Sequence, residues 1–267
     1  MDGSLPTIVL KIGGSVLTDR AFDRPAVRRG ILQSVAQEIA SAWQAGGFRL
    51  VVVHGAGSFG HPIVKRTGID RGIRTTTDRL AFAETQRLQT VLNGIVVASL
   101  IRAGLPAFPF QASANVVLEA GKILSFALAP LLEILQWGMV PVLNGVPAAD
   151  KAQGCSVLSG DVLAGYLATA LGAQVVLHGT NVRGVFTDDP AWNPHARFLP
   201  ELELRDPAGL PKGVGGSAAT DVTGGMRKKL EEIARTGVSC QIYDATVQGN
   251  TRRALLGEVV GTMVRRG

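Results

Sequence analysis

The sequence has little cysteine, few aromatic residues and no apolar run long enough to span a bilayer. Its two cysteines, Cys155 and Cys240, provide no framework of disulfide bonds. Aromatic residues make up 5% of the chain and do not interleave with basic ones, as they do in proteins that bind single-stranded nucleic acid. The first residues lack the basic start and apolar core of a signal peptide. We therefore expect a cytoplasmic enzyme that binds neither membrane nor nucleic acid.

Several motifs of common enzyme classes are also missing. No G-x-x-x-x-G-K-[ST] motif occurs, which excludes a P-loop kinase, and the protein-kinase motifs are absent. No group of Cys and His residues has the spacing of a zinc site, so we expect no metal held by the protein itself. The net charge of +6 is spread over scattered residues, and a site for phosphorylated small molecules explains it as well as nucleic acid does.

The remaining sequence alternates between strand and helix patterns. Apolar runs predict strands at 7–12, 49–53, 140–143, 174–177, 239–243 and 258–264. Helical periodicity and capping residues predict helices at 25–45, 78–103, 127–137, 159–171 and 224–236, with loops over 187–216. This alternation is typical of an α/β fold with a mostly parallel sheet covered on both faces. Without an internal repeat or linker, we expect one compact unit with two lobes.

Unusual loops follow four of these strands. They are Gly13-Gly14-Ser15, the glycine-rich turn at 55–60, Asn144-Gly145 and Thr180-Asn181. Ligands of such folds bind beyond the carboxyl ends of the strands. We therefore predict that all four loops meet at one crevice.

The glycine-rich turn is the most informative feature of the chain. Gly55, Gly57 and Gly60 allow the backbone to approach an anion closely, and His61 follows where a ring nitrogen can bind the same anion. The glycines also match the G-x-G-x-x-G pattern of dinucleotide-binding folds. However, the residues after Pro62 are predicted to form loops instead of a helix, and no acidic residue follows at a second strand end. The pattern therefore favours a phosphate over a dinucleotide.

Three charged residues are candidates for phosphate chemistry. Lys11 lies in an otherwise apolar strand and needs an anionic partner if it is buried, whereas a lysine at the strand end can also reach solvent. Lys229 follows Gly224-Gly225 at a helix start, which is either an anion site or an ordinary capped helix. Asp161 at another helix start either caps that helix or holds the two lysines in place.

Taken together, these segments resemble the amino acid kinase superfamily and, within it, the isopentenyl phosphate kinases. The motifs that carry the resemblance are 11–18, 54–62, 159–161, 184–190 and 221–226 with Lys229. The histidine that closes the glycine turn, His61, is the most discriminating of them. The resemblance implies a three-layer αβα sandwich with a mostly parallel central sheet, usually a homodimer. It also implies transfer of the γ-phosphoryl group of ATP to isopentenyl phosphate.

The resemblance assigns residues to three groups. The catalytic group is Lys11, Arg20, His61, Asp161 and Lys229. Substrate binding is assigned to Gly55, Ala56, Gly57, Gly60, His61 and Gly160. Nucleotide binding is assigned to Lys11, Gly13, Gly14, Ser15, Thr180, Asn181, Gly184, Phe186, Asp189, Pro190, Gly225 and Lys229. Backbone N–H groups of Gly13, Gly14, Gly55 and Gly160 would contact phosphates, and Mg²⁺ would be held mainly by ATP. We expect an acceptor lobe at 1–172 and a nucleotide lobe at 173–267.

The sequence departs from the family pattern at two places. Arg20 stands where the family has lysine, and Thr180-Asn181-Val182-Arg183-Gly184 replaces a run with two aspartates. These changes bear on the substrate and nucleotide more than on the reaction type. A kinase of another small phosphate or phosphonate, such as fosfomycin, and a non-catalytic nucleotide-binding protein are the alternatives. An isoprenoid tail also needs an apolar wall, for which the helix carrying Leu80, Phe82, Leu88 and Val91 is the candidate.

Overall fold

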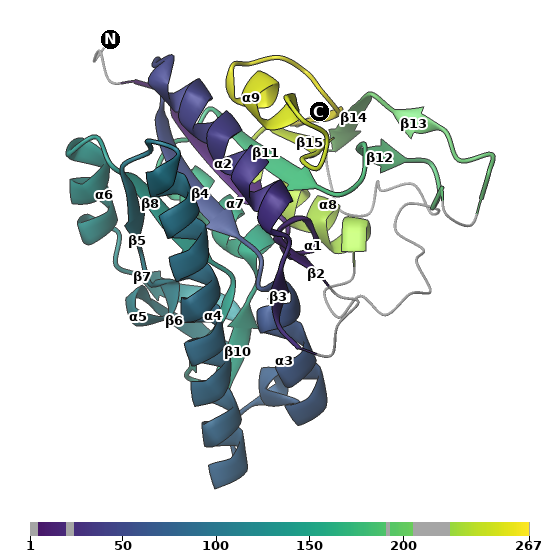
Figure 1. Cartoon of the computed structure of the whole chain (residues 1–267). Coiled ribbons are helices and arrows are strands. Elements are labelled where there is room, and N and C mark those ends of the chain that lie inside the picture. The colour runs from purple at the N-terminus through teal and green to yellow at the C-terminus, as the bar shows by residue number, and fades with distance from the viewer. Residues whose placement is uncertain (1–4, 20–23, 191–192, 205–224, 267) are drawn as a thin grey trace.

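The computed structural model describes residues 5–19, 24–190, 193–204 and 225–266. Its centre is an eight-stranded sheet whose strands lie side by side in the order β14, β16, β15, β11, β1, β4, β8, β5 (Figure 1). In that order they span Glu201–Leu204, Thr262–Arg266, Cys240–Asp244, Val175–Thr180, Thr7–Ile12, Arg49–His54, Val140–Asn144 and Ala107–Pro109. Neighbouring strands from β15 to β5 are parallel. Strand β16 pairs antiparallel with β15, and β14 pairs parallel with β16. The predicted mostly parallel sheet is confirmed.

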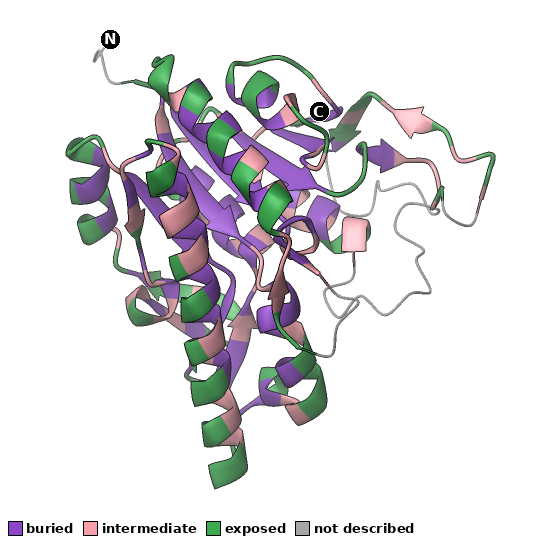
Figure 2. Cartoon of the chain, in the orientation of Figure 1, coloured by how far each residue is buried: buried purple, intermediate pink, exposed green. Residues whose placement is uncertain are grey.

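Helices cover both faces of this sheet, as the three-layer prediction required. On one face α2 (Arg29–Gln44), α4 (Thr76–Arg102) and α9 (Asn250–Leu255) pack on strand residues such as Leu10 and Val52. On the other, α6 (Ala129–Gln136), α7 (Gly160–Ala170) and α8 (Gly225–Thr236) pack on residues such as Val9 and Val51. The central strands β1, β4, β8, β11 and β15 are buried along most of their length (Figure 2). Successive residues of β1 therefore enter opposite cores, and Lys11 shares its face with Val9.

Smaller elements complete the chain. A four-stranded sheet lies in the order β10 (Gly154–Leu158), β9 (Val146–Asp150), β6 (Val116–Glu119), β7 (Lys122–Phe126). Two short pairs are β2 (Thr18–Asp19) with β3 (Ala26–Val27), and β12 (Val185–Phe186) with β13 (Phe198–Leu199). The short helices are α1 (Gly14–Leu17), α3 (His61–Thr67) and α5 (Ala112–Asn115), with 3₁₀ turns at Gly57–Phe59 and Ile69–Arg71. No helix among the described residues is long and apolar enough to cross a membrane.

Three predicted boundaries need correction. The closing strand expected over 258–264 spans Thr262–Arg266. The helix expected over 25–45 begins at Arg29, because Ala26 and Val27 pair with β2 instead. The residues after the glycine turn, expected to be loop, begin with α3, in which Pro62 occupies a first-turn position that tolerates its missing N–H. Gly68, in the left-handed conformation, ends that helix. A helix does follow the glycine turn, so the expected loop was a wrong argument against a dinucleotide site.

Candidate active site

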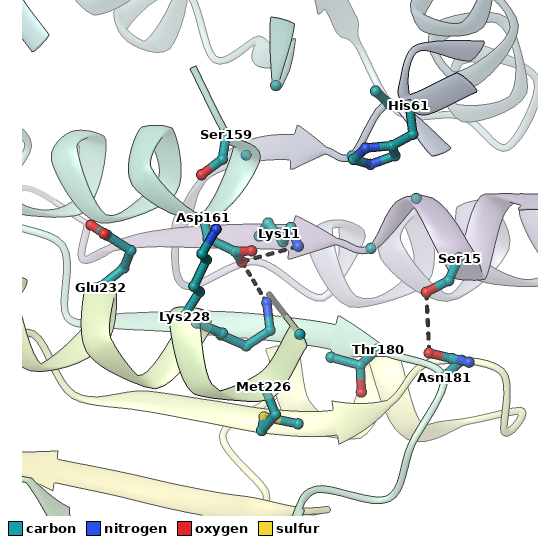
Figure 3. A pocket seen from close by; sticks show the side chains of 18 of the residues that line it. Lys11, Ser15, His61, Ser159, Asp161, Thr180, Asn181, Met226, Lys228 and Glu232 are labelled. Carbon is teal, nitrogen blue, oxygen red and sulfur yellow. Dashed lines mark hydrogen bonds and ion pairs between the residues drawn. The ribbon is translucent and has the colours of Figure 1, made fainter. Parts of the chain in front are cut away.

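A cavity of about 700 Å³ opens beyond the carboxyl ends of the central strands. The residues Gly13, Gly14, Ser15, Gly55, Ala56, Gly60, Gly145, Thr180 and Asn181 line it. Loops after β1, β4, β8 and β11 therefore meet at one crevice, as the sequence predicted. Figure 3 shows the cavity with His61 and Lys11 facing it from different elements.

At the centre of the cavity, Asp161 holds two lysines together. Its Oδ1 atom lies 3.0 Å from Nζ of Lys11 and 2.5 Å from Nζ of Lys229. The lysines come from β1 and α8, and Asp161 lies in the first turn of α7, where Ser159 provides the cap by accepting from the Val162 N–H. The side chains of both lysines are less than 10% exposed. Lys11 is therefore buried and paired, and it does not reach bulk solvent.

Burial and charge set the protonation states of this cluster. Burial lowers the pKa of Lys11 to about 8, although the Asp161 carboxylate opposes that change. Burial by itself would raise the pKa of Asp161, but the ammonium groups of Lys11 and Lys229 hold it well below its usual value. Asp161 is therefore a carboxylate at neutral pH, and Lys11 is mostly protonated. The cluster carries a net positive charge that suits phosphate.

His178 is a further member of this cluster that the sequence analysis did not identify. It stands beside Lys11 in the register of β11 and β1, so both side chains face α7. Its Nδ1 atom lies 3.3 Å from Oδ1 of Asp161. Burial, with the charge of Lys229, lowers the pKa of His178 to about 4. A neutral ring therefore borders the carboxylate without adding a third positive charge. The signal was its position directly after the apolar run of a predicted strand.

The glycines at the crevice are required by close backbone contact. A Cβ atom on Gly14 would lie 2.4 Å from the amide nitrogen of Gly57, and one on Gly55 would lie 2.5 Å from that of Gly14. Gly57 has a positive φ of 51° and packs against Thr18 instead of lining the cavity. The two loops interlock, which fixes the turn that carries His61 at the start of α3.

Two predicted phosphate donors are already engaged within the protein. The N–H of Gly13 donates to the carbonyl oxygen of Gly179, and that of Gly55 donates to Ile12. In this structure these amides join neighbouring strand ends, so their expected role toward phosphate does not hold. The same role stays a prediction for Gly14 and Gly160, which also line the cavity.

The loops expected to frame the nucleotide are tied together across the cavity. Ser15 Oγ donates to Oδ1 of Asn181, which links the loops after β1 and β11 (Figure 3). Arg183 does not line the cavity; its guanidinium carbon lies 4.2 Å from the ring centre of Phe198, which in turn meets Phe186 edge-on. The two residues that replace family aspartates therefore brace the loop instead of offering carboxylates.

The cavity contains nearly all of the predicted site residues. Those that line it are Lys11, Gly13, Gly14, Ser15, Gly55, Ala56, Gly60, His61, Gly160, Asp161, Thr180, Asn181, Gly184, Phe186, Asp189, Pro190, Gly225 and Lys229. Arg20 and the motif residues 221–224 lie outside the described residues. Lining residues that the sequence analysis missed include Val64, Asp70, Gln89, Val157 and Glu232.

The predicted apolar wall was wrong. Leu80 and Val91 are 67% and 43% exposed on the outer side of α4, and Leu88 packs into the core. Helix α4 offers the cavity Gln89 instead, while apolar lining comes from Val64, Val157 and other residues of α3, β10 and α7. The apolar residues of this helix had been assigned to the cavity wall, because sequence periodicity does not specify which face of a helix meets a cavity.

No group of three or more Cys, His, Asp or Glu side chains among the described residues is placed to hold a metal ion. At the cavity centre, Oδ1 of Asp161 pairs with the ammonium groups of Lys11 and Lys229. Asp188 accepts hydrogen bonds from Asn193 and from the N–H of Asp189.

Comparison with known proteins gives a consistent family. The model of the amino acid kinase family matches residues 6–243. The chain is 39% identical to the isopentenyl phosphate kinase of Methanothermobacter thermautotrophicus, over 96% of this chain and 98% of that protein. It is 33% identical to the isopentenyl phosphate kinase of Arabidopsis thaliana, over 81% of this chain and 73% of that protein. A solved structure of isopentenyl phosphate kinase matches 97% of this chain and 99% of its own, with a TM-score of 0.83 and 36% identity.

Proposed function

This chain belongs to the amino acid kinase family, and we propose that it transfers the γ-phosphoryl group of ATP to isopentenyl phosphate, forming isopentenyl diphosphate. The observation that carries the proposal is the pairing of Lys11 and Lys229 through Asp161 in a cavity that His61 also lines. The cavity provides cationic groups at its centre and a glycine-rich turn at its edge. The isopentenyl phosphate kinases among the relatives of this chain support the choice of acceptor.

The reaction requires charge neutralisation and positioning more than acid–base chemistry. The acceptor oxygen of a phosphate monoester is already ionised, so no general base is needed. Negative charge is shared between the transferring group and both oxygens in line with it, where Lys11 and Lys229 would stabilise it. Asp161 would hold the two ammonium groups at a fixed separation, so that little reorganisation accompanies the transfer.

We propose the following division of the cavity. His61 and the turn at Gly55, Ala56 and Gly60 would bind the acceptor phosphate, while Gly57 would support the turn from behind. The loop from Thr180 to Pro190 and the start of α8 at Gly225 would frame ATP. This division matches an acceptor lobe at 1–172 and a nucleotide lobe at 173–267, both of which contribute to the cavity. Arg20, outside the described residues, would act with the catalytic group.

ATP would enter with Mg²⁺ on its phosphates. Among the described residues, no group of carboxylates is placed to hold the ion. The need for ATP favours the cytoplasm as the place of reaction, where the buried thiols of Cys155 and Cys240 would remain reduced. We also propose a homodimer. Exposed apolar side chains of α4, among them Leu80, Val91 and Ile101, are a surface that pairing would cover. Sedimentation of the purified protein tests this.

The cavity also favours an acceptor with an organic tail. Val64, Val157, Leu158 and Val162 give its lining apolar positions. The polar contribution of α4 through Gln89 would suit a small phosphonate, but the isopentenyl phosphate kinases among the relatives outweigh that single residue. A non-catalytic nucleotide-binding protein would not need both buried lysines and their shared carboxylate.

Steady-state release of ADP tests the proposal directly. The purified protein is given ATP and Mg²⁺ with isopentenyl phosphate, dimethylallyl phosphate, longer isoprenyl phosphates or fosfomycin. We expect the highest kcat/KM with isopentenyl phosphate. Turnover with fosfomycin alone would keep the kinase and replace the acceptor. ATP binding without turnover of any acceptor would favour the non-catalytic alternative.

A further inference from the structure

Gln89 is a buried polar residue in the cavity wall that the proposed mechanism does not use. It lies on α4, is 2% exposed, and lines the cavity beside the glycine turn. Its neighbours on the helix, such as Leu88 and Leu92, pack into the core. A buried amide is retained where its polar atoms find partners, since leaving one unpaired away from water is destabilising. The partners of Gln89 therefore indicate its role.

Asn144 at the end of β8 fixes one end of the Gln89 amide. Its Nδ2 atom donates to Oε1 of Gln89 at 3.1 Å. The same Nδ2 lies 3.4 Å from the carbonyl oxygen of Gly145, which is compatible with a donor and would repel an acceptor. The carbonyl oxygen of Gly145 therefore favours Nδ2 of Asn144 on this side, while Oδ1 of Asn144 is buried and has no hydrogen-bond partner among the described residues. Oε1 of Gln89 must then face Asn144, because only an oxygen accepts from an N–H.

The other end of the amide faces the glycine turn. A Cβ atom on Gly60 would lie 2.4 Å from Nε2 of Gln89, so the absence of a side chain at Gly60 makes room for it. Among the described residues, no hydrogen-bond acceptor pairs with this Nε2 group. The group is not among the fully buried polar atoms that lack a partner, and Gln89 lines the cavity. Two N–H donors are therefore presented next to the residue that precedes His61.

We propose that Gln89 is a further binding residue for the acceptor, donating from Nε2 to an anionic oxygen of the phosphate held at the glycine turn. The inference rests on the proposed function for the position of that phosphate. The hydrogen bond involves a neutral donor and a charged acceptor, a kind that is stronger than one between two neutral groups. Asn144 is a positioning residue for it, because it selects which end of the amide faces the ligand.

Replacing Gln89 with methionine tests the donor. Gln89→Met keeps the length of the side chain and removes both N–H groups. We expect KM for isopentenyl phosphate to rise about tenfold or more, with KM for ATP unchanged, as one charge-assisted hydrogen bond predicts. An unchanged KM would mean that Gln89 only fills the wall. A lowered KM would mean that it faces the organic tail. Either result overturns the proposal.

Gln86→Met is the matched control on the same helix. Gln86 donates to the carbonyl oxygen of Pro147 and accepts from Gln111 and Ser113, and it does not line the cavity. This variant is expected to lose stability without a change in KM for the acceptor. A rise in KM as large as that of Gln89→Met would assign both effects to distortion of α4 and reject the proposal.

Asn144→Asp tests the orientation of the amide. A carboxylate at 144 accepts a hydrogen bond instead of donating one, so the Gln89 amide should rotate and present Oε1 to the phosphate. The loss of acceptor affinity should then exceed that of Gln89→Met, and the double variant should be no worse than Asn144→Asp. Fully additive effects of the two substitutions would contradict a role of Asn144 through Gln89.

Binding of inorganic phosphate separates this inference from the proposed function. Inorganic phosphate has no organic tail, so its dissociation constant, measured by calorimetry, reports on the phosphate position alone. If wild type failed to turn over isopentenyl phosphate, the proposed acceptor would be wrong, but weaker phosphate binding by Gln89→Met would still support the donor. Equal binding by wild type and Gln89→Met, or none by either, would overturn it.

Discussion

The Nζ atom of Lys11 lies 3.0 Å from Oδ1 of Asp161, and that oxygen also pairs with Lys229. Strand β1 and helices α7 and α8 are separate in sequence, yet they meet at this one atom. The arrangement follows from the alternation of β1, which directs Lys11 to the face that α7 and α8 cover. Without the carboxylate, two like charges would be buried close together.

We expect Asp161→Asn to lower kcat by about 100-fold or more. The substitution removes the carboxylate that holds the ammonium groups of Lys11 and Lys229 in place to stabilise the transferring group. The variant should also be less stable by about 3–5 kcal/mol, since it leaves buried ammonium groups unpaired. Steady-state kinetics and urea unfolding measure the two effects. Glu231→Gln, which removes a surface ion pair with Arg227, is the control. A variant with wild-type kcat would contradict the role of Asp161.

Activity should fall at alkaline pH as Lys11 loses its proton. Burial lowers the pKa of Lys11 to about 8, so its ammonium form predominates below that pH and disappears above it. The profile of kcat/KM against pH should therefore decline with an apparent pKa near 8. Bound phosphates favour the charged form, so kcat should decline at higher pH than kcat/KM. In Lys11→Arg, whose guanidinium stays charged, the alkaline decline should vanish; a flat wild-type profile to pH 9.5 would refute the assignment.

The central fold and most of the site were predictable because they depend on short-range signals. Apolar runs such as that of β1 gave the parallel strands, and glycines marked the loops that approach each other. The resemblance to a family then placed Lys11 and Asp161 in one site. The contact itself was not predictable from the spacing, because residues 11 and 161 meet only after long-range packing.

The missed features depend on tertiary context. The second sheet was not predicted because β7 is largely exposed and its pairing with β6 is irregular. Its stability depends on Asp150, which accepts from Ser156 and from backbone N–H groups of the β6–β7 turn. Helix α9 was missed for a similar reason. Its first N–H groups are capped by Glu38, a residue more than 200 positions away on α2.

His61→Ala should weaken use of the acceptor and leave ATP binding intact. The side chain lines the cavity at the glycine turn, whereas the loops that would frame the nucleotide come from other parts of the chain. Loss of a contact to a charged phosphate predicts a rise in KM for isopentenyl phosphate of about 10-fold to 100-fold. Acceptor kinetics at saturating ATP and equilibrium binding of ATP separate the two effects. His195→Ala removes an exposed histidine and serves as the control. Unaltered acceptor kinetics in His61→Ala would reject the phosphate role.

Acidification below pH 6.5 should destabilise the protein through His178. The pKa of His178 is about 4 in the fold and about 6.5 in an unfolded chain, so between these values the unfolded state binds a proton that the folded state does not. The free energy of unfolding should therefore decrease as pH falls from 6.5 toward 4, by about 3 kcal/mol from this residue. Burial lowers the pKa of His54 as well, which acts in the same direction.

Urea unfolding between pH 5 and 6.5 isolates this effect, because the unfolded carboxylates are still mostly ionised there. His178→Asn keeps an amide donor near Asp161 and has no proton to gain, so its stability should depend less steeply on pH than that of wild type. His195→Ala should retain the wild-type slope, since the exposed ring at 195 lies outside the buried cluster. Equal slopes for wild type and His178→Asn would show that His178 is not held neutral by burial beside the two lysines.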